Sequence, residues 1–155
     1  MTKSSKKAPS VDSLDKDTVP KLPDLPDPRR LHDATDRLNA VLHDFERTLG
    51  GLKLGVTASV TLDEDEHGWF KQLAFTKSGN EFKLVIETGN EFDDRGVETT
   101  ALTSASRETR LQAVAALPKL YKQLLKQFEA EIERVNESIT DVQRLADAIR
   151  TRAGK

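Results

Sequence analysis

The chain has 155 residues, of which 36% are hydrophobic and 32% charged, and its formal net charge at pH 7 is −2. A chain of this length forms one domain with a modest core and a well-solvated surface. It contains no cysteine, which excludes disulfides, zinc–thiolate sites and cysteine nucleophiles. No apolar run follows the lysines of residues 1–10, and no segment approaches a membrane span. We therefore expect a cytoplasmic protein that has no membrane partner.

Residues 1–28 are rich in lysine, serine, aspartate and proline, and their apolar residues are isolated from one another. This composition predicts a disordered tail. Within it, prolines at positions 20, 23, 26 and 28 favour an extended polyproline II segment that exposes Leu22 and Leu25. These two leucines are candidate docking residues for a partner. The alternative interpretation is a stiff leader into the first helix.

The first helix is expected over residues 29–49, where one apolar stripe recurs at helical spacing. Pro28 suits its first turn, and Asp27 is the expected N-cap. Gly50 and Gly51 are expected to end the helix, because glycine readily adopts the left-handed conformation of a C-cap.

A β meander is expected next. Residues 54–62 alternate apolar and polar side chains with a period of two, and residues 69–77 and 82–88 predict two further strands. Residues 63–68 are an acidic connecting loop, and residues 97–102 could add a short fourth strand at the edge of the sheet.

The sequence Gly-Asn-Glu-Phe occurs twice, at residues 79–82 and 89–92. Glycine followed by asparagine is a common sequence for tight hairpin turns. The repeat therefore predicts two hairpin turns of the same kind in the meander.

The last helix is expected to begin at a cap provided by Ser104 or Ser106 and to run to about Arg150. Pro118 lies inside it and predicts a kink. A break near Asn136 is the alternative to one continuous helix, because the residues that follow resemble a capping box. Its apolar residues form heptads at two positions: Leu111, Leu125, Ile132, Ile139 and Ala146 at one, and Val114, Tyr121, Phe128, Val135, Val142 and Ile149 at the other.

The last helix is too long for the rest of the chain to cover. Residues 105–151 would span roughly 70 Å, whereas residues 29–49 span roughly 31 Å as a helix and each strand about 26 Å. The wide apolar stripe of residues 111–128 suits packing on the sheet and on the first helix. The narrower stripe beyond it needs a second molecule, unless the helix folds back near Asn136.

The predicted fold class is therefore α+β, with an N-terminal helix, a three- to four-stranded antiparallel meander and a long C-terminal helix with coiled-coil-like heptads. Residues 29–128 form the body, residues 129–151 a helical extension for coiled-coil-like pairing, and residues 152–155 a frayed end. The candidate partner-binding residues on the extension are Ile132, Val135, Ile139, Val142 and Ile149.

No motif for nucleophilic catalysis, phosphate binding or dinucleotide binding is present, and no metal-ligand pattern is complete. We therefore expect no enzymatic activity, no metal and no cofactor. The favoured hypothesis is a non-enzymatic interaction or assembly module, whose partner is another protein or a second copy of the chain.

Nucleic-acid binding is the alternative hypothesis, because residues 105–155 hold ten basic and seven acidic residues, a net charge of +3. The predicted order of helix, three strands and helix is similar to that of double-stranded RNA-binding domains. That resemblance implies phosphate contacts from the start of the last helix. Residues 51–104 hold five basic and ten acidic residues, a net charge of −5, which opposes such binding. The candidate residues are Arg107, Arg110, Lys119, Lys122 and Lys126.

Overall fold

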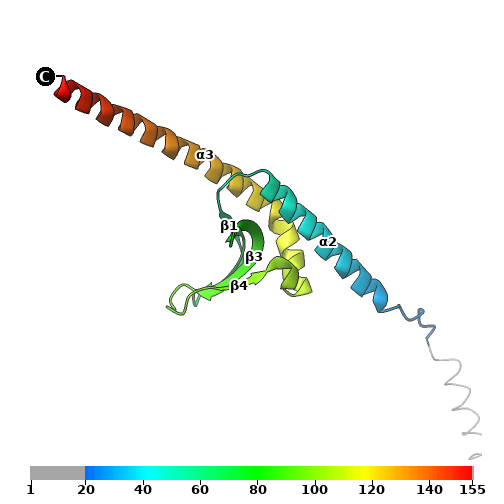
Figure 1. The fold of residues 1–155 in the computed structure, drawn as a ribbon. Helices are drawn as coiled ribbons and strands as arrows, with labels where there is room; N and C mark the ends of the chain where they lie inside the picture. Colours follow the sequence, from blue (N-terminus) through cyan, green and yellow to red (C-terminus); the bar gives the residue numbers. More distant parts are fainter. Residues whose placement is uncertain (1–19, 155) are drawn as a thin grey trace, which may run out of the picture. The chain divides into compact units, whose positions relative to one another are not determined.

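The computed structural model describes residues 20–154, which are arranged in the order helix, four antiparallel strands, helix (Figure 1). The predicted α+β class is confirmed, and the optional fourth strand is present. Residues 1–19 of the predicted tail, and Lys155 of the predicted frayed end, lie outside the described residues.

The chain divides into two units within its first described helix, Met1–Ala34 and Thr35–Lys155. In the first unit, residues 20–27 have no regular secondary structure, and α2 (Arg29–Gly51) begins after Pro28. The Asp27 carboxylate accepts a hydrogen bond from the backbone N–H of Arg29 at 3.0 Å. This contact confirms Asp27 as the residue that caps the helix.

In the second unit, α2 contributes Leu42 and Leu49 to the core. The Glu46 carboxylate accepts a hydrogen bond from the backbone N–H of Leu84 in β3 at 2.8 Å, which satisfies a strand N–H that faces the helix.

The predicted glycine cap of α2 is wrong. The helix includes Gly50 and Gly51, and the residue with left-handed backbone is Lys53, at φ 51°. Two turn hydrogen bonds explain the difference, because Leu52 N–H donates to the Leu49 carbonyl and Lys53 N–H donates to the Gly50 carbonyl. These bonds continue the turn beyond the two glycines, so the reversal comes later.

The sheet is an antiparallel meander in the order β1-β2-β3-β4. Its strands are β1 (Ala58–Glu64), β2 (Trp69–Ser78), β3 (Glu81–Asn90) and β4 (Glu98–Ala101). β1 begins four residues later than predicted, because residues 52–57 form a connection in which Gly55 has φ +70°. The alternating pattern of residues 54–57 reflects partly buried side chains of that connection.

The two Gly-Asn-Glu-Phe sequences have different structures. Ser78 pairs with Glu81, so Gly79 and Asn80 form a two-residue turn, and Gly79 has the positive φ of +66° that such turns require. In the second copy, Gly89 lies within β3 opposite Phe70, so the second predicted hairpin turn is wrong. A Cβ on Gly89 would lie 3.1 Å from Phe70 Cζ, so this glycine makes room for the ring.

One core joins the sheet to both helices. Its buried members are Leu42, Leu49, Val60, Leu73, Phe75, Leu84, Ile86, Leu102, Ala113, Leu120 and Leu124. Leu102 belongs to a short 3-10 turn, η1 (Leu102–Ser104), which connects the last strand to the last helix. Leu124 is the last residue of the chain that belongs to this core.

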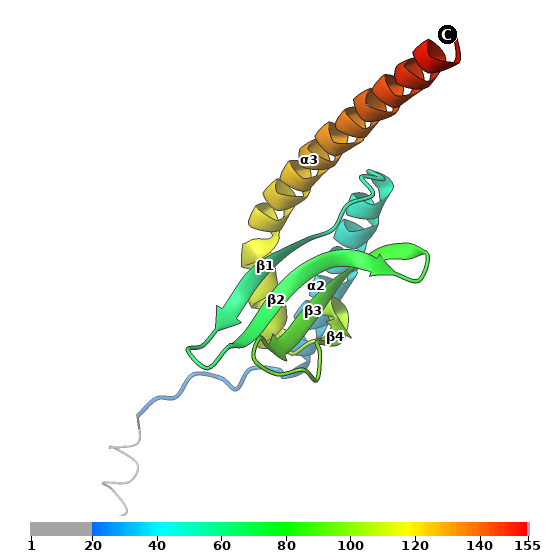
Figure 2. The same cartoon turned by 90° about the vertical axis from the view of Figure 1, so that its left-hand side faces the viewer.

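The last helix, α3 (Arg107–Ala153), is continuous, so the alternative of a break near Asn136 is wrong. Ser106 is its N-cap, and the Ser106 hydroxyl oxygen accepts a hydrogen bond from Thr109 N–H at 3.2 Å. The ribbon changes direction in its yellow section, the part of the helix that contains Pro118, as predicted (Figure 1, Figure 2). Proline has no N–H to donate to the preceding turn.

The face of α3 that enters the core is one part of the wide apolar stripe predicted for residues 111–128. The sheet-facing residues are Ala113, Leu120 and Leu124, whereas the heptad residues Leu111, Val114, Tyr121 and Leu125 are all more than a third exposed. Each buried residue comes immediately before a heptad residue, Val114, Tyr121 or Leu125. Adjacent residues are about 100° apart around a helix, so the buried row and the heptads lie on different sides of α3.

Candidate functional site

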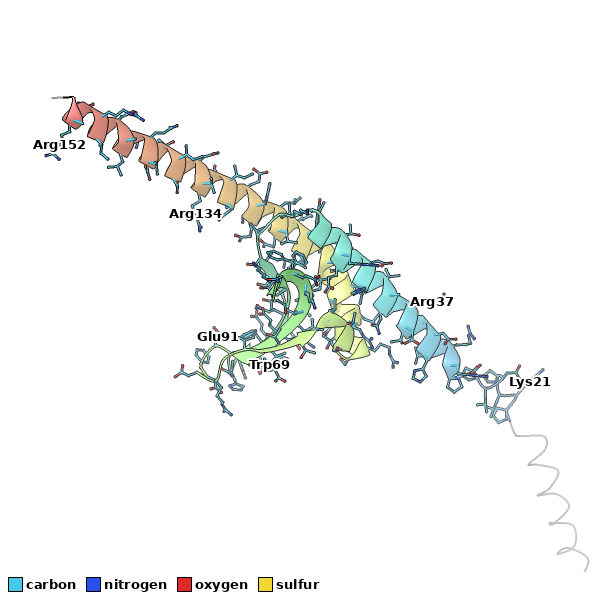
Figure 3. The ribbon with its side chains drawn as sticks, in the orientation of Figure 1. Lys21, Arg37, Trp69, Glu91, Arg134 and Arg152 are labelled. Atoms are coloured by element: carbon cyan, nitrogen blue, oxygen red, sulfur yellow. The ribbon has the colours of Figure 1, made fainter. Side chains whose placement is uncertain are left out.

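The part of α3 beyond Leu124 carries an exposed apolar stripe. Figure 2 and Figure 3 show α3 continuing past the sheet, and residues 132–145 are all exposed. We call this stripe the α3 seam; it consists of Ile132, Val135, Ile139, Val142, Ala146 and Ile149. The five residues predicted to bind a partner are all members, and their exposed fractions run from 40% to 65%.

Two hydroxyls near the α3 seam are hydrogen-bonded within the helix. Ser138 Oγ donates to the Arg134 carbonyl at 3.0 Å, and Thr140 Oγ1 donates to the Asn136 carbonyl at 3.1 Å. Hydroxyls that bond back to the preceding turn need no other partner. The seam can therefore be covered by an apolar surface without leaving these groups unpaired.

Leu145 is a member of this surface that the heptad analysis did not include. Its side chain is 62% exposed, and it follows Val142 by three residues and precedes Ile149 by four. Residues at these spacings are neighbours on a helix surface. This spacing can be read from the sequence, so the sequence already indicated that Leu145 lies on the exposed apolar surface.

A second apolar surface lies nearer the body. A groove between α2 and α3 is lined mainly by Phe45, Leu49, Leu52, Val114, Leu117 and Tyr121. Tyr121 and Val114 also belong to the heptads that lead into the α3 seam. The apolar stripe of α3 therefore runs from the body to the end of the helix.

One of the five basic residues proposed for phosphate contacts is buried rather than exposed. Arg110 is only 9% exposed, and its Nη1 donates to Asn39 Oδ1 at 2.5 Å, which links α3 to α2. The other four, Arg107, Lys119, Lys122 and Lys126, are exposed. The structure has four strands where the double-stranded RNA-binding order has three.

In the first unit, Leu22 and Leu25 are both exposed, as predicted for an extended proline-rich segment. Within residues 20–154, no group of three or more histidine or acidic side chains could hold a metal ion. Over the same residues, neither helix has a stretch that is both long and apolar enough to cross a bilayer.

No known family model matches this chain. No curated protein and no solved structure matches it either.

Proposed function

We propose that the protein is a non-enzymatic interaction or assembly module that binds a helical protein partner through the α3 seam. The observation that supports this is the exposure of five large apolar side chains at five of six consecutive heptad positions, beyond the last core residue. Contiguous exposed apolar surface on a folded chain marks sites of protein interaction. Heptad spacing suits another helix, because side chains at these positions fit between those of a neighbouring helix.

The body has a separate role in this proposal. Its core holds the first part of α3 through Ala113, Leu120 and Leu124, which are fully buried. The seam is thus presented on a helix whose start is anchored and capped. Leu22 and Leu25 are proposed as a second contact, since both are exposed in a segment with four prolines. The cytoplasmic location stays a prediction.

Site-specific photo-crosslinking in expressing cells tests this function. A crosslinking amino acid at Val142, in the seam, should give a discrete protein adduct, and Ile139→Asp should abolish it. The same amino acid at Ala130, whose position is on the opposite side of α3, is the matched control and should give no adduct. Equal crosslinking from both positions, or none from Val142, would refute the proposal.

A further inference from the structure

We infer that the partner of the α3 seam is a second copy of this chain, with the two helices antiparallel about a twofold axis between Thr140 and Asp141. This inference rests on the proposed function, because it names the occupant of the same surface. The reasons are the pairing of apolar residues, the placement of charge and the length of the helix past the core.

The apolar residues of the seam pair well in this arrangement. An antiparallel pair brings each heptad position opposite the other one. Ile139 then lies opposite Val142 of the second copy, Val135 opposite Ala146, and Ile132 opposite Ile149. The twofold axis repeats each pair, so the two helices form six layers of paired side chains. Every residue of the seam then has an apolar residue of the second copy opposite it.

The charged residues beside the seam select this register. In antiparallel helices, equivalent flanking positions of the two copies face each other across the seam. Glu129 then faces Arg150 of the second copy, and Glu131 faces Arg152 of the second copy. With the symmetric counterparts, the pair of helices gains four contacts between opposite charges at its two ends. Uncharged residues, Asn136 and Gln143 among them, occupy the flanking positions near the axis.

Other arrangements lack this complementarity. In a parallel pair, the flanking residues that meet are Glu131 with Asn136, Ser138 with Gln143, and Leu145 with Arg150, none of which joins opposite charges. An antiparallel pair shifted by one heptad toward the bodies places Lys122 opposite Arg150 of the second copy, which is repulsive. A shift the other way removes the charge contacts and shortens the seam.

The side chains that would form these contacts are available. Figure 3 shows Arg134 and Arg152 extending from the part of α3 that lies past the sheet. Glu131 now pairs with Arg134 at 3.1 Å, and Arg150 pairs with Asp147 at 2.6 Å, within the same helix. These four side chains are between 44% and 76% exposed, so their ion pairs contribute little and can be exchanged for contacts with the second copy.

The length of α3 fits the same register. Core contacts end at Leu124 and the helix ends at Ala153. With the axis between Thr140 and Asp141, Ala153 of the second copy lies opposite Phe128. The paired segment, residues 128–153, covers roughly 39 Å at 1.5 Å per residue. The second copy therefore covers the whole seam and stops short of the core residues.

Sedimentation velocity of the purified chain gives the first test. We expect a monomer–dimer equilibrium, in which Glu129→Arg raises the dissociation constant about three- to tenfold, because exposed ion pairs contribute modestly. The double variant Glu129→Arg with Arg150→Glu should return it to the parent value. Glu137→Arg, which makes the same charge change away from the seam, is the control and should leave it within about twofold. A folded double variant that dimerises no better than Glu129→Arg alone would overturn the register.

Spin labels decide the orientation, since the chain has no cysteine of its own. Thr140→Cys and Thr151→Cys each add one labelling site outside the seam. In the antiparallel pair the two labels at position 151 are separated by roughly 32 Å along the axis, and those at position 140 by roughly one residue rise. The distance measured for Thr151→Cys should therefore clearly exceed that for Thr140→Cys.

Two results would overturn the inference. Equal distances from the two labelled variants would show parallel pairing. A chain that stays monomeric at every concentration would show that the second copy is not the occupant. In both cases the crosslinking experiment at Val142 still tests the proposed function separately.

Discussion

Arg110 Nη1 donates a hydrogen bond to Asn39 Oδ1 at 2.5 Å, across 71 positions of sequence. Arg110 is one of two buried polar or charged residues in the described chain, and its Nε has no hydrogen-bond partner there. A buried guanidinium with so few partners depends strongly on each one. The contact therefore joins α2 to the start of α3 as a structural link, at a position that the alternative, nucleic-acid hypothesis assigned to a phosphate contact.

Asn39→Ala should destabilise the protein by about 1–3 kcal/mol, because it leaves a buried charged donor unpaired. Replacing both partners with apolar residues, as in Asn39→Leu with Arg110→Met, should cost clearly less than Asn39→Ala alone, since no donor is then left unpaired. Urea denaturation monitored by circular dichroism measures both. A double variant less stable than Asn39→Ala would contradict this account of the contact.

Leu124 and Leu125 provide a matched test of which face of α3 enters the core. Leu124 is 0% exposed and Leu125 is 39% exposed, although only Leu125 belongs to the heptads. Leu124→Ala should cost about 2–5 kcal/mol in the free energy of unfolding. Leu125→Ala should cost about 1 kcal/mol or less, because much of that side chain already contacts water. Similar costs in urea denaturation would indicate that the helix is rotated from the position described.

Ile139→Asp should leave the stability of the monomer within about 0.5 kcal/mol of the parent, as expected for exposed sites. The reason is that Ile139 is exposed and lies fifteen positions beyond Leu124, the last core residue. Thermal or urea unfolding at low protein concentration measures this, with Ala130→Asp as the control for adding an aspartate to the same helix. A large loss of stability specific to Ile139→Asp would mean that the seam packs within its own chain.

Binding to duplex RNA should be weak and sensitive to salt, because the exposed basic residues of α3 adjoin a region of net charge −5. If binding occurs, Lys119→Ala with Lys122→Ala should reduce the slope of log affinity against log salt by about two. Fluorescence anisotropy over a salt series measures the slope, and Arg144→Ala serves as a basic-residue control far along the helix. Tight binding that resists salt would favour the nucleic-acid hypothesis over the interaction module.

Local sequence was sufficient for most of the secondary structure. The sequence predicted β2 and β3 to within two residues at each end, and the Gly79–Asn80 turn followed from residues adjacent in the chain. Asp27 was predicted as the cap of α2, and Ser104 or Ser106 as the cap of α3, because a side chain that accepts from the first helical N–H groups is local by nature. The structure of the second Gly-Asn-Glu-Phe sequence was not predicted correctly. Its glycine, Gly89, makes room for the Phe70 ring on another strand, and no local pattern shows this.

The seam was also predicted from sequence, by comparing the length of the last helix with the length of everything that could cover it. The continuity of that helix was left open because Ser138 and Thr140 resemble capping residues. In the structure their hydroxyls donate to the carbonyls of the preceding turn, so they do not act as caps. A serine or threonine hydroxyl can either cap a new helix or bond to the preceding turn, and a small difference in free energy decides between the two.

By itself, the sequence determined the α+β order of elements, the N-cap of α2 and the apolar heptads of the last helix, because these depend on residues near one another in the chain. Only the tertiary structure decided which row of α3 faces the sheet, since Ala113, Leu120 and Leu124 compete with the heptads for the same core. It also decided that Arg110 is buried against Asn39. Both outcomes depend on contacts between distant segments, and no local pattern records how those segments approach.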